Sequence, residues 1–387
     1  MNEDIKHNGM IVLGSTGSVG TQALDVAERT ATPVEAICAN RDVDTVEAQA
    51  RKFGVKACAM ADASAAQALK IKLADTAVRV YAGQEGIAQM IREASAPIAL
   101  NSIIGEAGLN STLTVLRSGK QLALANKESL VVAGEIVMRE ARERGIAIRP
   151  VDSEHCAIAQ ALRAGEHGEV KKLILTASGG PFFGRKREEL TNVRASDALA
   201  HPTWSMGAKI TIDSASMMNK GFEIIEAAYL FDIPTERIDV VVHRESIIHS
   251  MVEYIDHSII AQMSVPDMRH CIQHALTHPC REAAAIAPLD LVAIGKLTFA
   301  SPDEQAFPLL GAARRAMSAG GAVPAVLNAA NEVAVDAFLH DRIGFLALSD
   351  IVCEVVEQLS AAKNAHTLEE ILHFDRLARQ TANSYIK

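Results

Sequence analysis

Residues 10–20 of the chain read Met10-Ile11-Val12-Leu13-Gly14-Ser15-Thr16-Gly17-Ser18-Val19-Gly20. Four consecutive apolar residues are typical of a strand buried on both faces, and the glycines that follow allow a tight turn into a helix. Such a turn lets the backbone approach a pyrophosphate, towards which the first N–H groups of the helix point. Because the spacing is G-x-x-G-x-x-G, the alternative is a turn that only packs the helix on the strand. Its position at the first strand of a βαβ series favours a dinucleotide-binding site.

The alternation of strands and helices continues to residue 151. Amphipathic segments such as residues 23–29 and 130–144 lie between apolar runs that we expect to be strands, at residues 34–39, 57–60, 96–100, 121–125 and 146–151. Apolar strands that alternate with helices predict a parallel sheet covered on both faces. Residues 1–151 are therefore predicted to form a doubly wound, Rossmann-type α/β domain with its ligand at the carboxyl ends of the strands.

The pattern changes after residue 151. A central α+β domain over residues 152–285 is predicted from strand-like stretches at residues 171–176, 210–212, 238–242, 247–254 and 258–265. Residues 286–309 contain several prolines and little periodicity, which is typical of an extended linker. A small C-terminal helical bundle is predicted over residues 310–387 from helical patterns at residues 311–317, 325–339, 348–359 and 368–381.

The composition excludes several classes of protein. A net charge of −9 and an aromatic content of 4% argue against a nucleic-acid partner, which needs a basic face and stacking platforms. No apolar run approaches the roughly 18 residues that span a bilayer, so we expect no membrane partner. A polar, acidic start and six scattered cysteines, without a Cys-x-x-Cys pair, indicate a cytoplasmic protein with reduced thiols.

The end of the second expected strand predicts which dinucleotide binds. An NAD site usually carries an acid about 20 residues past the glycines, where it binds the ribose hydroxyls. Here the strand is followed by Asn40, Arg41 and Asp42. Arg41 can pair with a 2′-phosphate and Asn40 is neutral, which favours NADP. Asp42 leaves an alternative open, since it could neutralise Arg41 or accept the ribose hydroxyls itself.

A pair of acids follows the expected strand at residues 146–151. Asp152 and Glu154 are two residues apart, which in an extended chain places both carboxylates on one side. The two acids repel unless a cation or a proton intervenes, and oxygen ligands alone favour Mg²⁺ or Mn²⁺. The alternative is an ordinary helix N-cap, which this motif taken alone favours.

A second group of acids lies on an expected helix after residues 211–216. Asn219, Glu223 and Glu226 share one face of that helix, and burying two bare acids there would be costly. Two serines and Lys220 near the start of the helix make an anion site together with its free N–H groups. The alternative is a solvated polar stripe with a serine cap, and this motif alone does not separate the two.

Loops at the ends of expected strands carry the remaining candidates. The turn Ser178-Gly179-Gly180-Pro181 can cradle a phosphate, although such turns are common. Lys127 lies at the carboxyl edge of the first sheet, where a substrate contact is favourable. The loop at residues 201–207 contains His201 and the only tryptophan, Trp204. It is interpreted either as a lid whose Trp covers the ligand or as a Trp that fills the junction between two elements.

Taken together, these motifs resemble the 1-deoxy-D-xylulose 5-phosphate reductoisomerase family over nearly the whole chain. Their joint occurrence in order is far more specific than any one of them. The motifs that carry the resemblance are Gly14–Gly20, Asn126–Ser129, Val151–His155, Ser178–Phe182, His201–Gly207, Asp213–Glu223, Pro266–Arg269 and Leu327–Glu332.

The resemblance implies a role for each matching residue. The implied metal ligands, for one Mg²⁺ or Mn²⁺, are Asp152, Glu154 and Glu223. The implied substrate-binding residues are Lys127, Ser153, Glu154, Ser178, His201, Trp204, Ser214, Asn219, Lys220 and Glu223. The implied NADPH-binding residues are Thr16, Gly17, Ser18, Val19, Asn40, Arg41, Asp42, Asn126, Glu128 and Gly207. The implied catalytic residues are Lys127, Glu154, His201 and Glu226. Relatives often have Gly and Asn where this chain has Asn40 and Asp42, a departure at the ribose-phosphate contact.

The resemblance also implies the reaction and the assembly. The expected activity is the NADPH-dependent conversion of 1-deoxyxylulose 5-phosphate into 2-C-methylerythritol 4-phosphate, in the non-mevalonate route to isoprenoids, by a homodimer. A hard cation at the substrate's ketone would polarise the carbonyl during the carbon-skeleton rearrangement, and NADPH would reduce the resulting aldehyde. Two alternatives are a dehydrogenase that never rearranges carbon and an NADP-binding regulator without activity.

Overall fold

The computed structural model describes residues 9–200 and 206–386, and this part of the chain divides into two compact units. The first unit comprises the described residues of Met1–Ser129 together with Val137–Cys156 and Asp267–Ala287. The second unit comprises Leu130–Ile136, Ala157–Pro266 and the described residues of Pro288–Lys387. Within the described ranges, every helix is too short or too polar to cross a bilayer.

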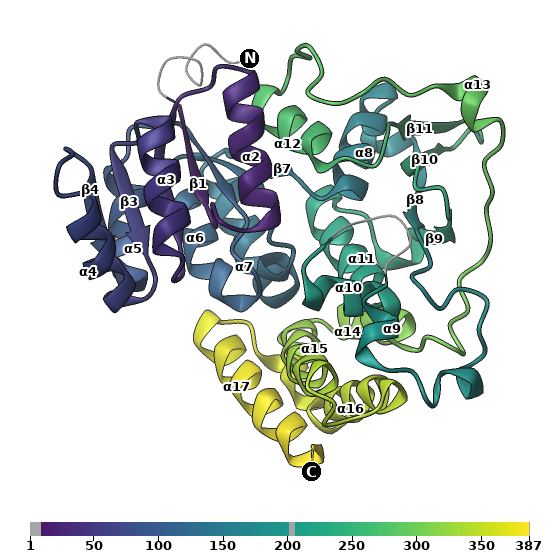
Figure 1. Ribbon diagram of the computed structural model, residues 1–387. Coiled ribbons are helices and arrows are strands. Elements are labelled where there is room, and N and C mark those ends of the chain that lie inside the picture. Colours follow the sequence, from purple (N-terminus) through teal and green to yellow (C-terminus); the bar gives the residue numbers. More distant parts are fainter. Residues whose placement is uncertain (1–8, 201–205, 387) are drawn as a thin grey trace. The chain divides into compact units, whose positions relative to one another are not determined.

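The first unit is built on a seven-stranded sheet in which all neighbouring strands are parallel. Its order is β4-β3-β2-β1-β5-β6-β7, and Figure 1 labels β4, β3 and β1 from left to right. The strands are β1 (Met10–Leu13), β2 (Val34–Ala39), β3 (Ala57–Met60), β4 (Arg79–Ala82), β5 (Ile98–Asn101), β6 (Gln121–Leu124) and β7 (Arg149–Pro150). The order reverses at β1, which pairs with β2 on one side and β5 on the other. The predicted doubly wound sheet is therefore confirmed, and β1 ends at its topological switch point.

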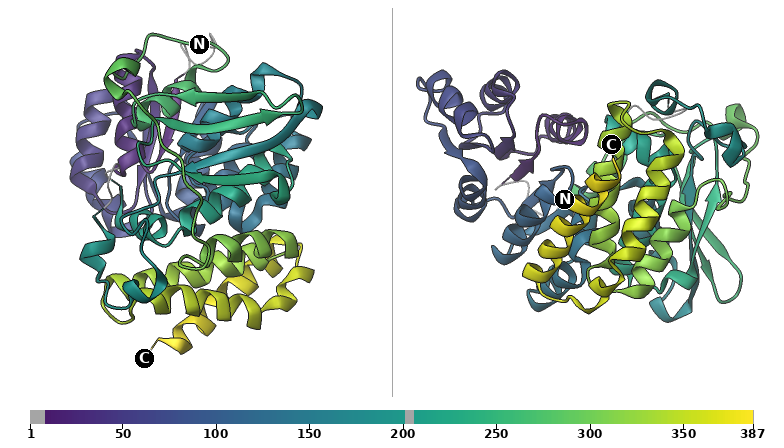
Figure 2. Two further views of the ribbon diagram at one scale, coloured as in Figure 1. Left: turned by 90° about the vertical axis from the view of Figure 1, so that its right-hand side faces the viewer. Right: turned by 90° about the horizontal axis from the view of Figure 1, so that it is seen from below.

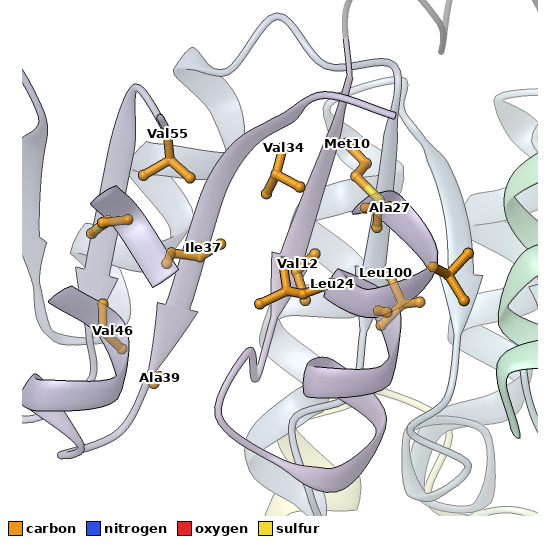
Figure 3. Packing of buried hydrophobic residues seen from close by; sticks show 14 of the residues in the cluster. Met10, Val12, Leu24, Ala27, Val34, Ile37, Ala39, Val46, Val55 and Leu100 are labelled. Carbon is orange, nitrogen blue, oxygen red and sulfur yellow. The ribbon is translucent and has the colours of Figure 1, made fainter. Parts of the chain in front are cut away.

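Helices cover this sheet because its strands are apolar on both faces. They are α2 (Ser18–Arg29), α3 (Val43–Phe53), α4 (Ala63–Lys72), α5 (Gly83–Glu93), η1 (Glu106–Gly108), α6 (Leu109–Arg117) and α12 (Met268–Thr277). Helices α7 (Glu128–Glu143) and α8 (Ser153–Ala161) have residues in both units. Figure 3 shows Leu24 and Ala27 of α2 packed against Met10 and Val12 of β1. All four are buried, so burial of apolar area fixes α2, and with it the glycine turn, on the sheet.

The second unit contains a four-stranded mixed sheet, seen broadside in Figure 2, left. Its order is β11-β10-β8-β9, with strands β8 (Val170–Ala177), β9 (Ile238–Val242), β10 (Ile248–Tyr254) and β11 (Ile259–Met263). Strand β10 runs antiparallel to β8 and β11, whereas β8 and β9 are parallel. The strands expected at residues 171–176, 238–242, 247–254 and 258–265 are confirmed.

The rest of the second unit is helical. Four C-terminal helices, with α15 packed on α14, α16 and α17, form the predicted bundle (Figure 2). The helices of this unit are η2 (Leu162–Ala164), η3 (His167–Glu169), η4 (Arg187–Leu190), α9 (Ala195–Ala198), α10 (Ala208–Ala215), α11 (Met218–Phe231), η5 (Thr235–Arg237), α13 (Leu291–Ile294), α14 (Leu309–Ala319), α15 (Val323–Leu339), α16 (Phe345–Gln358), η6 (Ser360–Asn364) and α17 (Leu368–Tyr385).

Three local predictions need correction. The expected strand at residues 210–212 is wrong, because these residues lie inside helix α10. Their isoleucines and threonine have high strand propensity, but Ile212 and Ala215 are fully buried three residues apart, so helical packing prevails. Strand β4 was not expected, since it lies at the sheet edge and has no buried residue. The expected strand at residues 146–151 is reduced to Arg149–Pro150.

Candidate active site

The glycine turn of the first unit joins β1 to α2 at the switch point. Gly14 has a φ of +85°, and the amides of Gly14 and Ser15 both donate to the carbonyl of Cys38, at 3.0 and 2.9 Å. Helix α2 begins at Ser18, and its N-cap residue, Gly17, offers no side chain to the first N–H groups. The turn and the helix start are thus arranged to bind a phosphate through the backbone.

The residues after β2 lie beside this turn in the topology of the sheet. Asn40, Arg41 and Asp42 are all exposed. The Arg41 guanidinium donates to Asp62 at 2.9 Å, and this bond orients the exposed Arg41 side chain. The Asp42 carboxylate accepts from the Thr45 amide at 3.1 Å and caps helix α3. In the described structure Asp42 therefore acts as a helix cap, and Arg41 is paired with Asp62.

The motif Asn126–Ser129 forms a packed turn between β6 and α7. The Asn126 side-chain amide donates to the Gly105 carbonyl and to Glu128, both at 3.0 Å. Its carbonyl oxygen accepts from the Ser129 amide at 3.1 Å and from the Ser129 hydroxyl. These bonds hold Lys127 between two fixed neighbours, with only 6% of that residue exposed.

Lys127 and the predicted acidic pair meet in the first unit. The Lys127 ammonium lies 2.6 Å from a carboxylate oxygen of Asp152. The other Asp152 oxygen accepts from the Glu154 amide at 3.1 Å and lies 3.4 Å from Nδ1 of His155. The Ser153 hydroxyl donates to the Glu154 carboxylate at 2.6 Å. Asp152 therefore caps the start of α8, as one of the two alternatives predicts, and its other oxygen faces the Lys127 ammonium; the metal site stays a prediction.

The electrostatic balance at Asp152 follows from these neighbours. Burial alone would raise the pKa of Asp152, but the Lys127 ammonium and His155 outweigh burial and hold the pKa well below its usual range. The carboxylate is thus ionised near neutral pH, which is the form that binds a metal ion.

The second unit contains the glycine-rich turn after β8. Gly179 and Gly180 both have positive φ, and Arg244 donates to the carbonyls of Ser178 and Gly180 at 3.1 and 2.7 Å. A Cβ on Gly180 would lie 2.9 Å from the carbonyl oxygen of Ser214. The structure therefore brings the Ser178 turn and the Ser214 segment into contact, as two parts of one anion site require.

Helix α11 carries the second acidic group on a buried face. Glu223 and Glu226 are 1% and 0% exposed, which rules out a solvated stripe. The Asn219 amide donates to Glu223 at 2.6 Å, and the Lys220 ammonium contacts the other Glu223 oxygen. Gly207 is the N-cap residue of α10, the helix that precedes α11. The predicted residues Asn219, Lys220 and Glu223 thus lie together on one helix.

Two predicted residues lie outside the described part of the chain, and two further residues were not indicated by the sequence. His201 and Trp204 lie outside the described residues, so the lid remains a prediction. Asp213 was not singled out for a role of its own, yet it is 1% exposed and pairs with Lys209 at 2.9 Å. Arg244 was also missed, because an isolated arginine 66 residues from Ser178 gives no local signal.

The three predicted metal ligands are divided between the two units. Asp152 and Glu154 belong to the first unit and Glu223 to the second.

Three family models match successive parts of the chain. Residues 10–134 match the model described as 1-deoxy-D-xylulose 5-phosphate reductoisomerase. Residues 148–231 match the 1-deoxy-D-xylulose 5-phosphate reductoisomerase C-terminal domain, and residues 263–381 match the DXP reductoisomerase C-terminal domain.

Curated relatives and solved structures match over nearly full length. The reductoisomerase of Acetivibrio thermocellus is 50% identical over 380 residues, covering 98% of this chain and 100% of the relative. That of Bacteroides fragilis is 47% identical over 389 residues and covers 100% of both chains. The Zymomonas mobilis enzyme, solved in complex with NADPH, is 42% identical with a TM-score of 0.92 and coverage of 98% and 99%. A structure of DOX-P reductoisomerase with NADPH, fosmidomycin and magnesium has a TM-score of 0.91, 37% identity and 98% coverage of both chains. The chain belongs to the 1-deoxy-D-xylulose 5-phosphate reductoisomerase family.

Proposed function

We propose that the residues described above carry out the reaction of the family in this chain. The chain is an NADPH-dependent oxidoreductase that converts 1-deoxy-D-xylulose 5-phosphate into 2-C-methyl-D-erythritol 4-phosphate. One observation carries the assignment of roles: the buried Lys127–Asp152 pair stands beside Glu154, at the start of a helix that follows the dinucleotide-binding sheet.

The proposed metal ligands are Asp152, Glu154 and Glu223. All three are carboxylates, and a donor set of oxygens alone suits Mg²⁺ or Mn²⁺ better than Zn²⁺. Lys127 contacts Asp152 and Lys220 contacts Glu223, so two of the three acids have a positive charge beside them, which supports the proposal. When bound, a divalent cation polarises the substrate's ketone and stabilises the negative charge that develops during rearrangement.

The proposed substrate site divides into a reactive end and a phosphate end. At the reactive end, Lys127 and Ser153 hydrogen-bond to the substrate's oxygens, and Glu154 acts beside the metal. At the phosphate end, Ser178, Ser214, Asn219 and Lys220 supply hydroxyl, amide and ammonium donors. Binding the distant phosphate holds the reacting carbons in position and lowers the barrier by orientation.

The remaining proposed roles rest on the family resemblance. His201 closes on the phosphate, Trp204 covers the substrate and Glu226 acts as a second acid near the metal. Glu226 is fully buried on α11, the helix that also carries Glu223.

The proposed cofactor site lies along the switch point of the first sheet. The residues that we assign to it are Thr16, Gly17, Ser18, Val19, Asn40, Arg41, Asp42, Asn126, Glu128 and Gly207. The glycine turn binds the pyrophosphate, and Arg41 binds the 2′-phosphate that distinguishes NADPH from NADH. NADPH supplies the hydride that reduces the aldehyde formed by rearrangement.

We also propose a homodimer in the cytoplasm. Strand β11 is the edge of its sheet, and Ile259 and Ile260 on it are 51% and 37% exposed. An exposed apolar edge strand is a site for association with a second chain. Sedimentation equilibrium is expected to give twice the chain mass for the wild type and a lower mass for Ile259→Lys. A monomeric wild type would contradict the dimer.

The deciding experiment follows NADPH absorbance with 1-deoxyxylulose 5-phosphate, with Mg²⁺ and with a chelator. We expect oxidation only with the metal, and a branched methylerythritol phosphate in the product NMR spectrum. An unbranched polyol would indicate a plain dehydrogenase, and no turnover with Mg²⁺ would indicate a regulator.

A further inference from the structure

One hydrogen bond joins the C-terminal bundle to the segment that carries the proposed phosphate site. The side-chain amide of Asn331, on α15, donates to the Asp213 carboxylate on α10 at 2.7 Å. Asn331 is 0% and Asp213 1% exposed, so this bond is shielded from water. The two residues are 118 positions apart in the chain. The bond therefore holds together two distant segments of the second unit.

Asp213 lies directly before Ser214, at the end of helix α10. Its second carboxylate oxygen pairs with Lys209 at 2.9 Å, so both oxygens have a partner. Two residues after Ser214 the backbone bends sharply, because Ser216 ends α10 and the next residue, Met217, has a φ of +63°. This bend starts α11, which carries Asn219 and Lys220. Fixing Asp213 consequently helps to fix the direction in which the phosphate-binding helix departs, together with the packing of α11 on α14.

The bundle also reaches the other half of the phosphate site. Phe182 follows the Ser178 turn, and its ring lies edge-on to Phe345 of α16 with centroids 5.0 Å apart. Phe345 in turn contacts Phe338 of α15 at 5.6 Å. Both parts of the phosphate site are thus attached to the same bundle, one through a hydrogen bond and one through aromatic packing.

Asn331 is a buried polar residue in mainly apolar surroundings. It lies on a helix whose buried residues are mainly alanine, valine and leucine. Its side-chain carbonyl oxygen has no hydrogen-bond partner within the described ranges. A buried acceptor without a partner destabilises the fold, so an apolar residue would serve packing better. The bond to Asp213 accounts for the asparagine.

We infer that Asn331 is a positioning residue for substrate phosphate, acting through Asp213 on the Ser214–Lys220 segment. The inference rests on the proposed phosphate site. It assigns to the C-terminal bundle a part in substrate affinity, although the bundle supplies none of the proposed phosphate ligands.

The chain contains a matched control for this inference. Asn328 lies one turn before Asn331 on α15 and is also 0% exposed. Its side-chain oxygen likewise has no partner among the described residues, but its amide donates to Glu332 at 3.1 Å and not to Asp213. Asn331→Leu and Asn328→Leu therefore make the same chemical change on the same helix, and only the first removes the bond to Asp213.

The test compares the full-length wild type with both variants in NADPH and Mg²⁺. For Asn331→Leu we expect the KM for 1-deoxyxylulose 5-phosphate to rise about tenfold, which corresponds to about 1.4 kcal/mol. The dissociation constant of NADPH should stay within about twofold of the wild type, and Asn328→Leu should leave both constants unchanged. Calorimetric titration with inorganic phosphate should show the same tenfold loss for Asn331→Leu alone. If Asn331→Leu does not fold, Asn331→Ser replaces it, since its shorter side chain also cannot reach Asp213.

Equal KM values and equal phosphate affinities for the two variants would overturn the inference. A wild type that binds phosphate without converting the sugar phosphate would count against the proposed function instead, and the phosphate titration would then decide the role of Asn331.

Discussion

The ammonium of Lys127 lies 2.6 Å from the carboxylate of Asp152, and their side chains are only 7% and 10% exposed. An ion pair removed from water recovers its desolvation cost only through close geometry and further hydrogen bonds. Here the Glu154 amide supplies one such bond to Asp152. The pair therefore keeps a proposed metal ligand ionised and oriented inside the protein.

Lys127→Met tests the Lys127–Asp152 ion pair through its effect on the free energy of unfolding. The change leaves the Asp152 carboxylate without its ammonium, so we expect the metal-free protein to lose about 3 kcal/mol of unfolding free energy. Saturating Mg²⁺ should restore part of that loss, because a cation at Asp152 replaces the missing charge. Urea unfolding with and without Mg²⁺ measures both effects. The same loss under both conditions would contradict a metal at Asp152.

Glu223→Gln tests the proposed metal ligand on α11. The substitution keeps the shape of the side chain but removes one of three negative charges. We expect turnover to fall at least about 100-fold and the Mg²⁺ concentration for half-maximal activity to rise. NADPH oxidation over a range of Mg²⁺ concentrations provides the measurement. Glu236→Gln, at an exposed glutamate, is the control and should behave as the wild type. Near-normal activity of Glu223→Gln would remove this residue from the metal site.

Arg41→Ala tests the choice of dinucleotide. Arg41 is an exposed cation held by Asp62, and removing it takes away the partner of a 2′-phosphate. The KM for NADPH is expected to rise at least about tenfold, while the KM for NADH changes less than about twofold. Steady-state kinetics with NADPH and with NADH measures the two KM values. An equal effect on both would show that Arg41 does not recognise the phosphate.

Asp62 gives a prediction for the dependence of stability on pH. Hydrogen bonds from the Ser64 hydroxyl and the Ala65 amide, with Arg41, lower the pKa of Asp62 from 3.8 to about 2. A lowered pKa means that the ionised carboxylate stabilises the fold above about pH 4, and that this contribution disappears as the pH falls towards about 2. The difference in urea midpoint between the wild type and Asp62→Ala should thus be equal at about pH 7 and 5.5 and smaller at about pH 3.5. A difference that stays the same down to about pH 3.5 would show an ordinary pKa, and a difference that grows as the pH falls would show a raised one.

Gly20→Ala tests the packing of the dinucleotide turn. A Cβ on Gly20 would lie 2.1 Å from the carbonyl oxygen of Gly14, so the helix and the turn must separate. We expect a loss of about 1–3 kcal/mol in unfolding free energy and weaker NADPH binding. Fluorescence titration with NADPH and urea unfolding report the two effects. Gly168→Ala is the control, because a Cβ there meets nothing within 4 Å. Unchanged NADPH affinity in Gly20→Ala would show that the turn tolerates the displacement.

A strand with a buried, uninterrupted apolar run, such as β1, was predictable from the sequence, and the edge strand β4 was not. Strand β1 is fully buried along its length, so its four apolar residues gave a clear signal. Strand β4 has the same length but reads Arg79-Val80-Tyr81-Ala82, and its first and last residues are exposed. At a sheet edge the backbone pairing forms a strand without a burial pattern. The β-branched residues at 210–212 predicted a strand, but they form part of helix α10.

In the candidate site, contacts between residues far apart in the sequence were likewise not predictable from the sequence. Spacing along one helix predicted that Asn219, Glu223 and Glu226 share a face, because helix geometry fixes that relationship. No periodicity connects Lys127 with Asp152, or Asn331 with Asp213, since such pairs depend on how strands and helices pack. Tertiary packing therefore decides which predicted residues are paired.

The return of the chain to its first unit has a consequence for synthesis on the ribosome. Residues 267–287 rejoin that unit through α12, where Ile272, Ala275 and Leu276 belong to the same apolar core as α2. Arg269 adds a 3.0 Å bond to Asp25 of α2. A nascent chain that stops at residue 151 leaves this face of α2 bare. A fragment that ends before residue 267 would therefore lack part of the apolar core of the first unit.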